Sequence, residues 1–270
     1  MEFAAKYGPW ALVAGASDGL GAAMADELAC RGVNVVLLAR RQAVLDEVSA
    51  AIRDKHGVQT RTLSVDLAEP GASARVIEAT ADLQIGSLVY CAGADPNFEP
   101  FLTSPLVNAE SLVQRNCVVP LQLCHHYGRP MVDRGHGAIV IFGSGAGFAG
   151  GPNMVAYGAS KAFDMVFAEA LWAELHVHGV DVLGLILGKT NTPALRKLEF
   201  RRGVIESEDL APNDAASVDS VVAMAFENLD NGPTCLVGPE IEAAAQLLAS
   251  VGRNDAVKLI TQAIDASMGA

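Results

Sequence analysis

The chain has 270 residues, 51% of them hydrophobic, and it carries a formal net charge of −12 with an isoelectric point near 4.9. A chain of this length and apolar content can bury a large core, so we expect a single domain over residues 1–270, and the negative charge argues against binding to nucleic acid or anionic lipid. The apolar runs have about the length of strands, well short of the roughly 20 residues that span a bilayer, and the N-terminus lacks a signal-peptide pattern, so we expect no membrane segment and a cytoplasmic location.

In chain order, short runs rich in Val, Ile and Leu alternate with longer helical patterns, which is typical of βαβ units. We expect strands at residues 10–15, 33–39, 59–65, 86–91, 137–143, 180–187 and 234–237. We expect helices at residues 19–31, 41–56, 71–82, 104–133, 154–178 and 215–229. The alternation predicts an α/β fold of the Rossmann type, in which about seven parallel strands form one doubly wound sheet with helices on both faces.

Two segments depart from this alternation. Residues 189–214 mix Thr, Pro, basic and acidic residues between a strand and the next helix, where α/β sheets place ligand-covering loops. We therefore expect a substrate lid there. The tail at residues 240–268 has a helical pattern with apolar residues such as Leu247, Val257 and Ile260, and we expect it to pack on the body of the protein or on a partner subunit.

A glycine-rich turn, GASDGLG at residues 15–21, follows the first strand and precedes a helical run. Glycine lets the backbone turn sharply and approach a pyrophosphate closely, and the N-terminus of the following helix attracts anions. A turn that binds no ligand would have the same local sequence. The turn therefore predicts a dinucleotide site only in combination with further motifs.

Two arginines, Arg40 and Arg41, follow the second strand. In NAD-binding folds an acidic residue at this place binds the ribose hydroxyls, whereas a guanidinium suits the 2′-phosphate of NADP. Two arginines are also compatible with the solvated start of a helix. Asp66 follows the third strand, where it either lies next to a ligand or caps a turn.

Tyr157 and Lys161 lie four residues apart in a predicted helix, so both project from the same helix face. A phenol is a poor base at neutral pH, and a nearby cation favours the phenolate. Such a pair also occurs by chance on many helices. Ser144 precedes Tyr157 by thirteen positions and follows a predicted strand, so its hydroxyl belongs to the edge of the sheet where ligands bind.

Taken in this order, the motifs resemble those of the short-chain dehydrogenase/reductase family from Tyr7 to about Gly238. The resemblance implies a catalytic tetrad of Asn116, Ser144, Tyr157 and Lys161, and no metal. It implies that NADP(H) is the cofactor and that the following residues contact it: Gly15, Ser17, Gly19, Leu20, Arg40, Arg41, Asp66, Leu67, Ala92, Gly93, Tyr157, Lys161, Gly188, Thr190 and Thr192.

The family resemblance also implies the role of each member of the tetrad. Tyr157 exchanges a proton with the substrate oxygen while the cofactor exchanges the hydride. Lys161 favours the phenolate and holds the nicotinamide ribose, Ser144 positions the oxygen, and Asn116 links the lysine to solvent through water. The chain departs from the family pattern at Tyr90-Cys91, where two asparagines are usual, at Leu187, where proline is usual, and at Ala14, where threonine is usual.

Three segments are similar to those of bacterial 7β-hydroxysteroid dehydrogenases, which use NADP(H): KYGPW at residues 6–10, GVNVV at residues 32–36 with the two arginines that follow, and LGKTNTP at residues 187–193. We therefore expect interconversion of a secondary alcohol and a ketone on a small hydrophobic substrate such as a hydroxysteroid. A homodimer or homotetramer, formed through the helices at residues 104–133 and 154–178, is expected from the same resemblance.

Two alternatives remain open. A 3-oxoacyl thioester reductase needs a basic patch for the phosphopantetheine of its carrier, and Arg196, Lys197, Arg201 and Arg202 form such a patch or a solvated helix face. A protein that binds NADPH as a sensor or scaffold without turnover would share the cofactor motifs. The neighbouring residues Cys124, His125 and His126 are not expected to bind a metal, because adjacent helical side chains diverge by about 100°.

Overall fold

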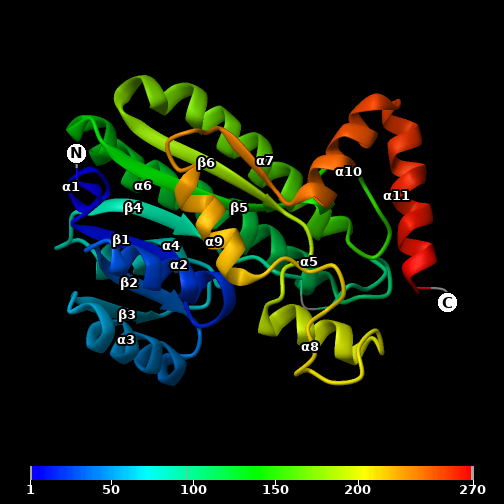
Figure 1. Ribbon diagram of the computed structural model, residues 1–270, viewed down its shortest axis with the longest axis horizontal. Helices are drawn as coiled ribbons and strands as arrows, with labels where there is room; N and C mark the ends of the chain where they lie inside the picture. Colours follow the sequence, from blue (N-terminus) through cyan, green and yellow to red (C-terminus); the bar gives the residue numbers. More distant parts are fainter. Residues whose placement is uncertain (1, 96, 269–270) are drawn as a thin grey trace.

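The computed structural model describes residues 2–95 and 97–268, and its centre is one parallel sheet of seven strands in the order β3-β2-β1-β4-β5-β6-β7 (Figure 1). The strands are β1 (Trp10–Ala14), β2 (Asn34–Ala39), β3 (Thr60–Ser64), β4 (Ile85–Tyr90), β5 (Gly137–Ser144), β6 (Val180–Leu187) and β7 (Thr234–Val237). Each strand end lies within one residue of its predicted position. The predicted fold class is confirmed.

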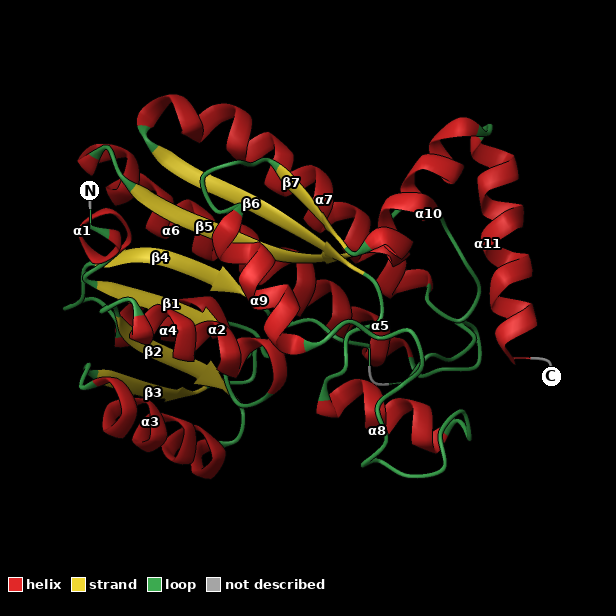
Figure 2. Ribbon diagram, viewed as in Figure 1, coloured by secondary structure: helices red, strands yellow, loops and turns green. Residues whose placement is uncertain are grey.

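Helices cover both faces of the sheet (Figure 2). One face carries α2 (Gly19–Cys30), α3 (Gln42–His56) and α9 (Val218–Glu227), and the other carries α4 (Ala72–Ala79), α6 (Val119–Arg134) and α7 (Val155–Leu175). A short helix that the sequence pattern did not predict, α1 (Phe3–Tyr7), precedes β1. In the part of the chain that the structure describes, no helix is both long and apolar enough to cross a membrane.

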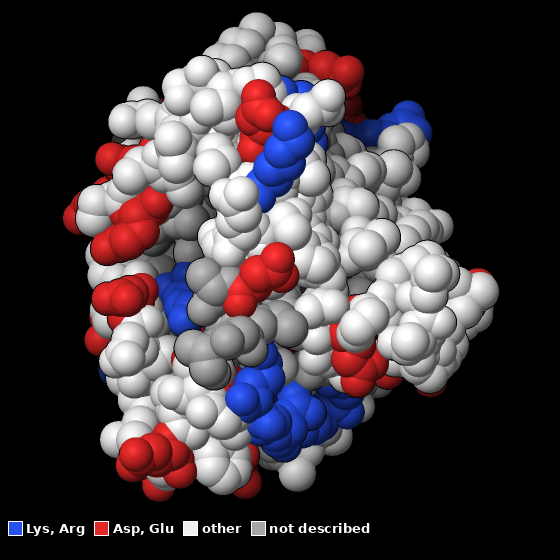
Figure 3. Space-filling model, turned by 90° about the vertical axis from the view of Figure 1, so that its right-hand side faces the viewer, with Lys and Arg blue, Asp and Glu red and all other residues white. Residues whose placement is uncertain are grey.

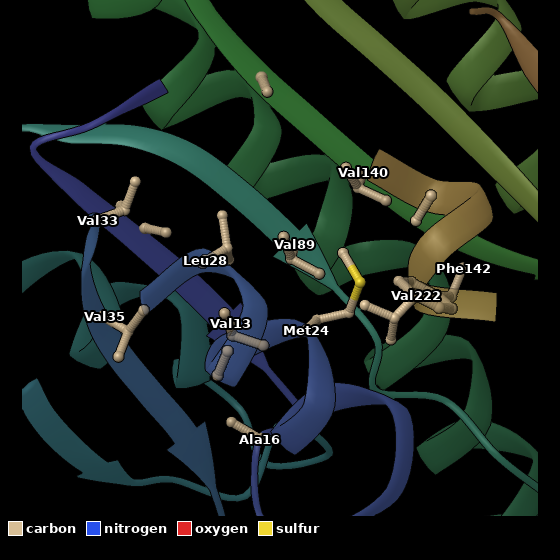
Figure 4. Close-up of a cluster of buried hydrophobic side chains, with 14 of the residues drawn as sticks. Val13, Ala16, Met24, Leu28, Val33, Val35, Val89, Val140, Phe142 and Val222 are labelled. Atoms are coloured by element: carbon tan, nitrogen blue, oxygen red, sulfur yellow. The ribbon is translucent and has the colours of Figure 1, made fainter. Parts of the chain in front are cut away.

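The core consists of two apolar clusters, one on each face of the sheet. Alternate residues of a strand point to opposite faces, so Val13 packs in one cluster and Leu12 in the other. Figure 4 shows the first cluster, in which Met24 and Leu28 of α2 lie against Val13 and Val89 of the sheet. Because both faces are covered, the inner strands β1, β2, β4, β5 and β6 are apolar along nearly their whole length, which explains the continuous Val-, Ile- and Leu-rich runs, whereas the edge strand β3 has no buried residue.

The strand order reverses between β1 and β4, so a crevice opens at the carboxyl ends of these strands. Most of the predicted site residues directly follow a carboxyl end of β1 to β6 or belong to the helices packed there. The fold therefore gathers at one edge of the sheet motifs that are far apart in the sequence.

Three further regions border this edge. The predicted helix at residues 104–133 consists of α5 (Leu106–Val113), a π-helical turn η1 (Gln114–Val118) and α6. Residues 189–214 contain α8 (Pro193–Arg201). The predicted helical tail is two helices, α10 (Pro239–Ser250) and α11 (Arg253–Met268), which stand together to one side of the sheet (Figure 1).

Candidate active site

The glycine turn at residues 15–21 joins β1 to α2. Its start is tied to β2, since the amides of Gly15 and Ala16 donate to the Leu38 carbonyl at 2.8 and 3.1 Å. Gly15 has a φ of +89°, and a Cβ at Gly21 would lie only 2.1 Å from the Gly15 carbonyl oxygen. Both glycines are therefore required by the turn itself. The first amides of α2 have no carbonyl partner within the helix, so this turn can hold a pyrophosphate at a helix N-terminus.

Arg41 bends back over the glycine turn. Its Nη2 donates to Ser17 Oγ at 3.0 Å and pairs with the carboxylate of Asp18, while Arg40 is exposed at the same strand end. The two guanidiniums place positive charge where a ribose phosphate would lie, and a bound phosphate would compete with Asp18 for Arg41.

Asp66 and Leu67 follow β3. The Asp66 carboxylate accepts a hydrogen bond from the Ala68 amide at 2.9 Å, so it caps the turn. Leu67 is buried. Asp66 thus has the capping role that the sequence left open, and contact of Asp66 and Leu67 with the cofactor stays a prediction.

Asn116 ties the end of β4 to α7. It is buried in η1, and its Nδ2 donates to the Gly93 carbonyl at 3.0 Å and to Ser160 Oγ at 2.9 Å. The Tyr90 hydroxyl donates to the Arg115 carbonyl in the same π-helical turn. These bonds join β4, η1 and α7 without the two asparagines that are usual before Ala92, and π-helical turns are frequent at functional sites.

Ser144 ends β5, and Tyr157 and Lys161 lie on α7. A tight turn, η2 (Gly145–Gly147), follows Ser144 and packs directly on α7, because a Cβ at Gly147 would lie 2.6 Å from the Ala162 amide nitrogen. Lys161 Nζ lies 5.9 Å from the centre of the Tyr157 ring. The structure therefore brings the predicted serine, tyrosine and lysine to the same edge of the sheet.

Lys161 is almost fully enclosed, with 5% of the residue exposed. Its Nζ donates to the Phe142 carbonyl at 2.8 Å and to the Asp164 carboxylate at 2.9 Å. Burial alone lowers the pKa of Lys161, but the attraction of Asp164 and of Tyr157 raises this pKa above its ordinary value. The ammonium is therefore the stable form of Lys161 at neutral pH.

Gly188, Thr190 and Thr192 form the base of the predicted lid. The amide of Ala216 donates to the Lys189 carbonyl at 2.9 Å, and the amide of Asn191 donates to the Ala216 carbonyl at 2.8 Å. Thr192 caps α8 by accepting a hydrogen bond from the Leu195 amide at 3.2 Å. The Thr192 methyl group would lie 3.3 Å from a Cβ on Gly19, so the lid base meets the glycine turn.

A second wall of the edge is formed by residues 148–154 and the tail. Arg253 Nη1 donates to the Phe148 carbonyl at 2.6 Å. A Cβ at Gly151 would meet Ile260 Cγ2 and Ile264 Cδ1 of α11 at 2.8 Å each. Next to this wall is a hollow of about 380 Å³, open to solvent, which is lined among others by Phe101, Leu112, Met154 and the carboxylates of Asp95 and Glu99. The tail thus packs on the body of this chain, which was one of the two predicted possibilities.

Sequence analysis did not identify Tyr90, Ser160 or Asp164, although each contacts a predicted site residue or its turn. Asp164 had a usable signal, because a carboxylate three residues after a lysine lies on the same helix face. Tyr90 and Ser160 had none, since their partners come from other elements. Within residues 2–95 and 97–268, no cluster of three or more His, Cys, Asp or Glu side chains could hold a metal ion.

Comparison with known proteins gives a consistent result. The family profile described as short chain dehydrogenase matches residues 9–202. The 7β-hydroxysteroid dehydrogenase of Clostridium sardiniense is 33% identical over 267 residues, which are 98% of this chain and 99% of the relative. A very-long-chain 3-oxoacyl-CoA reductase of Danio rerio is 36% identical over 186 residues, which are 68% of this chain and 60% of the relative.

Solved structures agree with these matches. A 7β-hydroxysteroid dehydrogenase studied for its stereoselectivity superposes with a TM-score of 0.86 and 29% identity, over 96% of this chain and 99% of that chain. A short-chain dehydrogenase from Sphingobium yanoikuyae in complex with NADPH superposes with a TM-score of 0.74 and 31% identity, over 91% of this chain and 96% of that chain.

Proposed function

We propose a cofactor and a substrate for this chain, which belongs to the short-chain dehydrogenase family and is an oxidoreductase acting on alcohols or ketones. It uses NADP(H) to interconvert a secondary alcohol and a ketone on a hydrophobic substrate. The first candidate for this substrate is a 7β-hydroxysteroid. The observation that carries the proposal is the convergence of Ser144, Tyr157 and a buried, charged Lys161 at the edge of the sheet where the glycine turn also lies. Asn116 completes the tetrad through its bonds to Gly93 and Ser160.

Three features of the chain fit a nicotinamide dinucleotide. The glycine turn lies at the N-terminus of α2, the strand end beside it carries Arg40 and Arg41, and the buried Thr190 Oγ1 has no hydrogen-bond partner in the structure. The bound cofactor supplies or accepts the hydride. We propose the following residues as its contacts: Gly15, Ser17, Gly19, Leu20, Arg40, Arg41, Asp66, Leu67, Ala92, Gly93, Tyr157, Lys161, Gly188, Thr190 and Thr192.

The tetrad performs the proton transfer. In reduction, the Tyr157 hydroxyl gives its proton to the substrate oxygen, and in oxidation the phenolate takes a proton from the alcohol. Ser144 Oγ donates a hydrogen bond to the same oxygen and orients it. The Lys161 ammonium stabilises the phenolate by its charge and offers a donor to the ribose of the cofactor. Asn116 fixes the position of α7 relative to β4 and η1.

The substrate lies between the lid at residues 189–214 and the wall formed by residues 148–154 and α11. Apolar side chains of this wall such as Met154 and Ile260 favour a hydrophobic substrate. Full-length similarity to a 7β-hydroxysteroid dehydrogenase supports the same choice. We also propose a cytoplasmic location, and the acidic net charge of −12 argues against nucleic-acid and anionic-membrane partners.

One observation favours a 3-oxoacyl thioester reductase as the second candidate. Lys and Arg side chains gather on the lower part of the face seen in Figure 3, the face that carries α8. This helix contains Arg196, Lys197 and Arg201, which suit the phosphates of a thioester carrier. Similarity to very-long-chain 3-oxoacyl-CoA reductases supports this alternative over 68% of the chain.

Consumption of NADPH or NADH with 7-ketosteroids, 3-oxoacyl thioesters and small ketones tests the proposal. We expect turnover of a 7-ketosteroid with NADPH and an about 10²–10⁴-fold lower kcat in Tyr157→Phe, because general acid–base catalysis contributes about that much. Tyr127→Phe is the matched control, since Tyr127 is a buried tyrosine that bonds Thr80 away from the site. Turnover of thioesters alone would select the second candidate, and tight NADPH binding without any turnover would indicate a sensor.

We further propose a homodimer or homotetramer formed through α5, α6 and α7. These helices expose the following large apolar side chains: Leu106, Val107, Val113, Leu121, Val155 and Val166. Exposed apolar surface of this kind favours association. Light scattering should give an oligomer mass that falls to the monomer mass in Leu121→Arg/Val166→Arg, whereas a wild-type monomer at micromolar concentration would refute this part of the proposal.

A further inference from the structure

The charged pair on α7 includes a carboxylate to which the proposed mechanism assigns no role. Asp164 lies one helical turn after Lys161, and the exposed fractions of the two side chains are 4% and 6%. Asp164 Oδ2 accepts a hydrogen bond from Lys161 Nζ at 2.9 Å, while its Oδ1 is buried without a hydrogen-bond partner. The hydrogen bond that this carboxylate accepts therefore comes from Lys161.

A buried ammonium is unstable without a counter-charge, because desolvation disfavours its charged form. Tyr157 and Cys91 also face Lys161, and Tyr90, Cys117 and Cys124 face Asp164. Burial raises the pKa of Cys91 to about 12 and that of Cys117 to about 11, so these thiols are neutral at physiological pH. Burial likewise raises the pKa of Tyr90 and of Cys124. Of the groups that face the pair, Asp164 is thus the one whose carboxylate supplies a compensating negative charge: burial raises the pKa of Asp164, and the charge and hydrogen bond of Lys161 oppose this rise.

The hydrogen bonds of Lys161 also fix its direction. An ammonium has three N–H donors. Two of them are used by the Phe142 carbonyl of β5 at 2.8 Å and by Asp164 of α7 at 2.9 Å. The ammonium is held between the strand that ends in Ser144 and the helix that carries Tyr157, with one donor left for a ribose hydroxyl.

We propose that Asp164 is a positioning residue, which keeps the Lys161 ammonium charged and fixed between β5 and α7 so that its remaining donor and its charge serve the cofactor and Tyr157. This inference rests on the proposed function of Lys161. According to this inference, Lys161 can act only while a buried carboxylate outside the tetrad keeps it charged.

The pH dependence of alcohol oxidation in Asp164→Asn tests this role, with a 7β-hydroxysteroid and NADP⁺ as the probe between about pH 6 and pH 10. Without the counter-charge of Asp164, the burial of Lys161 is opposed chiefly by the weaker attraction of Tyr157, so the pKa of Lys161 should fall. Buried lysines without partners titrate up to about 3–5 units low. Lys161 then loses its proton as the pH rises. We expect the oxidation rate of the variant to fall about tenfold per pH unit above this lowered pKa, while the wild-type rate rises or levels off.

Two control variants separate positioning from general stability. Asp164→Glu keeps the charge and should keep the wild-type shape of the pH profile. Glu169→Gln removes another carboxylate of α7, which bonds Thr234, and should also leave the shape unchanged. A pH profile of Asp164→Asn with the wild-type shape, whatever its amplitude, would overturn the proposal.

The ¹⁵N resonance of Lys161 Nζ gives an independent test if Asp164→Asn does not fold or if the steroid is not turned over. In the wild-type protein, this resonance, assigned by its loss in Lys161→Met, should show a protonated amine up to the pH at which an ordinary lysine titrates, because the pKa of Lys161 is raised by Asp164. Titration below that value would overturn the role of Asp164. Retained protonation together with the absence of turnover would refute the proposed function and leave the role of Asp164 supported.

Discussion

The strands that end at the candidate site are buried along nearly their whole length, whereas the segments that cover the site are mostly exposed. All six residues of β4 are buried, as are seven of the eight residues of β5. By contrast, α10 has no buried residue, and Glu199 is the one buried residue of α8. The cofactor side is therefore held by apolar burial, while the substrate side is held by a few polar bonds and side-chain contacts. Substitutions on the two sides should differ both in kind and in size.

The largest expected effect is on the cofactor side, at the glycine turn. In Gly21→Ala the new methyl group would lie 2.1 Å from the Gly15 carbonyl oxygen, and the backbone would have to move. We expect a loss of about 3 kcal/mol in the free energy of unfolding together with loss of NADPH binding, since overpacking costs about 1–3 kcal/mol or more. Denaturant unfolding and fluorescence titration with NADPH measure both effects.

Gly150→Ala is the control for this experiment, because a Cβ at Gly150 meets no atom within 4 Å. Its stability and NADPH affinity should match the wild type. Equal behaviour of the two variants would contradict the role assigned to the turn.

The next effect is on the choice of cofactor. Arg41→Ala removes the guanidinium beside Ser17, and a hydrogen bond to a charged group contributes about 1.5–3 kcal/mol. The ratio of kcat/KM for NADPH to that for NADH should fall about 10–100-fold, with the NADH value little changed. Arg53→Ala, which alters an arginine on α3 bonded to Ser49, should leave the ratio unchanged. An unchanged ratio in Arg41→Ala would show that Arg41 does not read the 2′-phosphate.

A smaller effect is expected on the substrate side, at the ion pair that joins α8 to the lid base. Lys189 Nζ lies 2.8 Å from Glu199 Oε1, and the exposed fractions of the side chains are 51% and 3%. Because the lysine is half exposed, breaking the pair should cost only about 1 kcal/mol. Lys189→Met and Glu199→Gln should raise the substrate KM and leave NADPH affinity unchanged.

The double variant decides whether the pair itself causes this effect. A double-mutant cycle on KM should show that the two substitutions are not additive, because each removes the same interaction. Additive effects would mean that Lys189 and Glu199 act separately.

An effect of similar small size is expected at α11. Ile260→Ala removes a contact with the turn at Gly151, and we expect a rise in the steroid KM of about fivefold, since a half-buried isoleucine contributes about 1 kcal/mol. Val257→Ala, on an exposed part of the same helix, should leave KM unchanged. A fall in stability with an unchanged KM would place α11 outside the substrate wall.

The same contrast explains what could be predicted from the sequence. The inner strands can be predicted to within one residue because burial on both faces requires uninterrupted apolar runs, as in β4 and β5. The positions of the glycine turn, Ser144 and Tyr157 follow from strand ends, which all lie at one edge of a parallel sheet. Local sequence patterns were therefore sufficient to predict the fold of the whole chain and the convergence of these motifs.

The remaining features depend on contacts between distant elements. The π-helical turn at residues 114–118 and the bond from Tyr90 to Arg115 have no local pattern, since they arise where β4 meets α5. The division of the tail at Gly252 is a local signal, because glycine weakens a helix, but the packing of α11 on Gly151 is not. Ser160 bonds Asn116 across 44 positions of the chain, so no spacing rule could pair them.

The backbone bonds between residues 189–191 and Ala216 close the neck of the lid segment. Because its two ends are fixed to each other, the interior of such a segment can change in length and sequence without moving the sheet. The residues between the two ends can thus differ among proteins of this fold without a change in the sheet. Such exchange would let substrate range diverge while the hydride- and proton-transfer machinery stays the same.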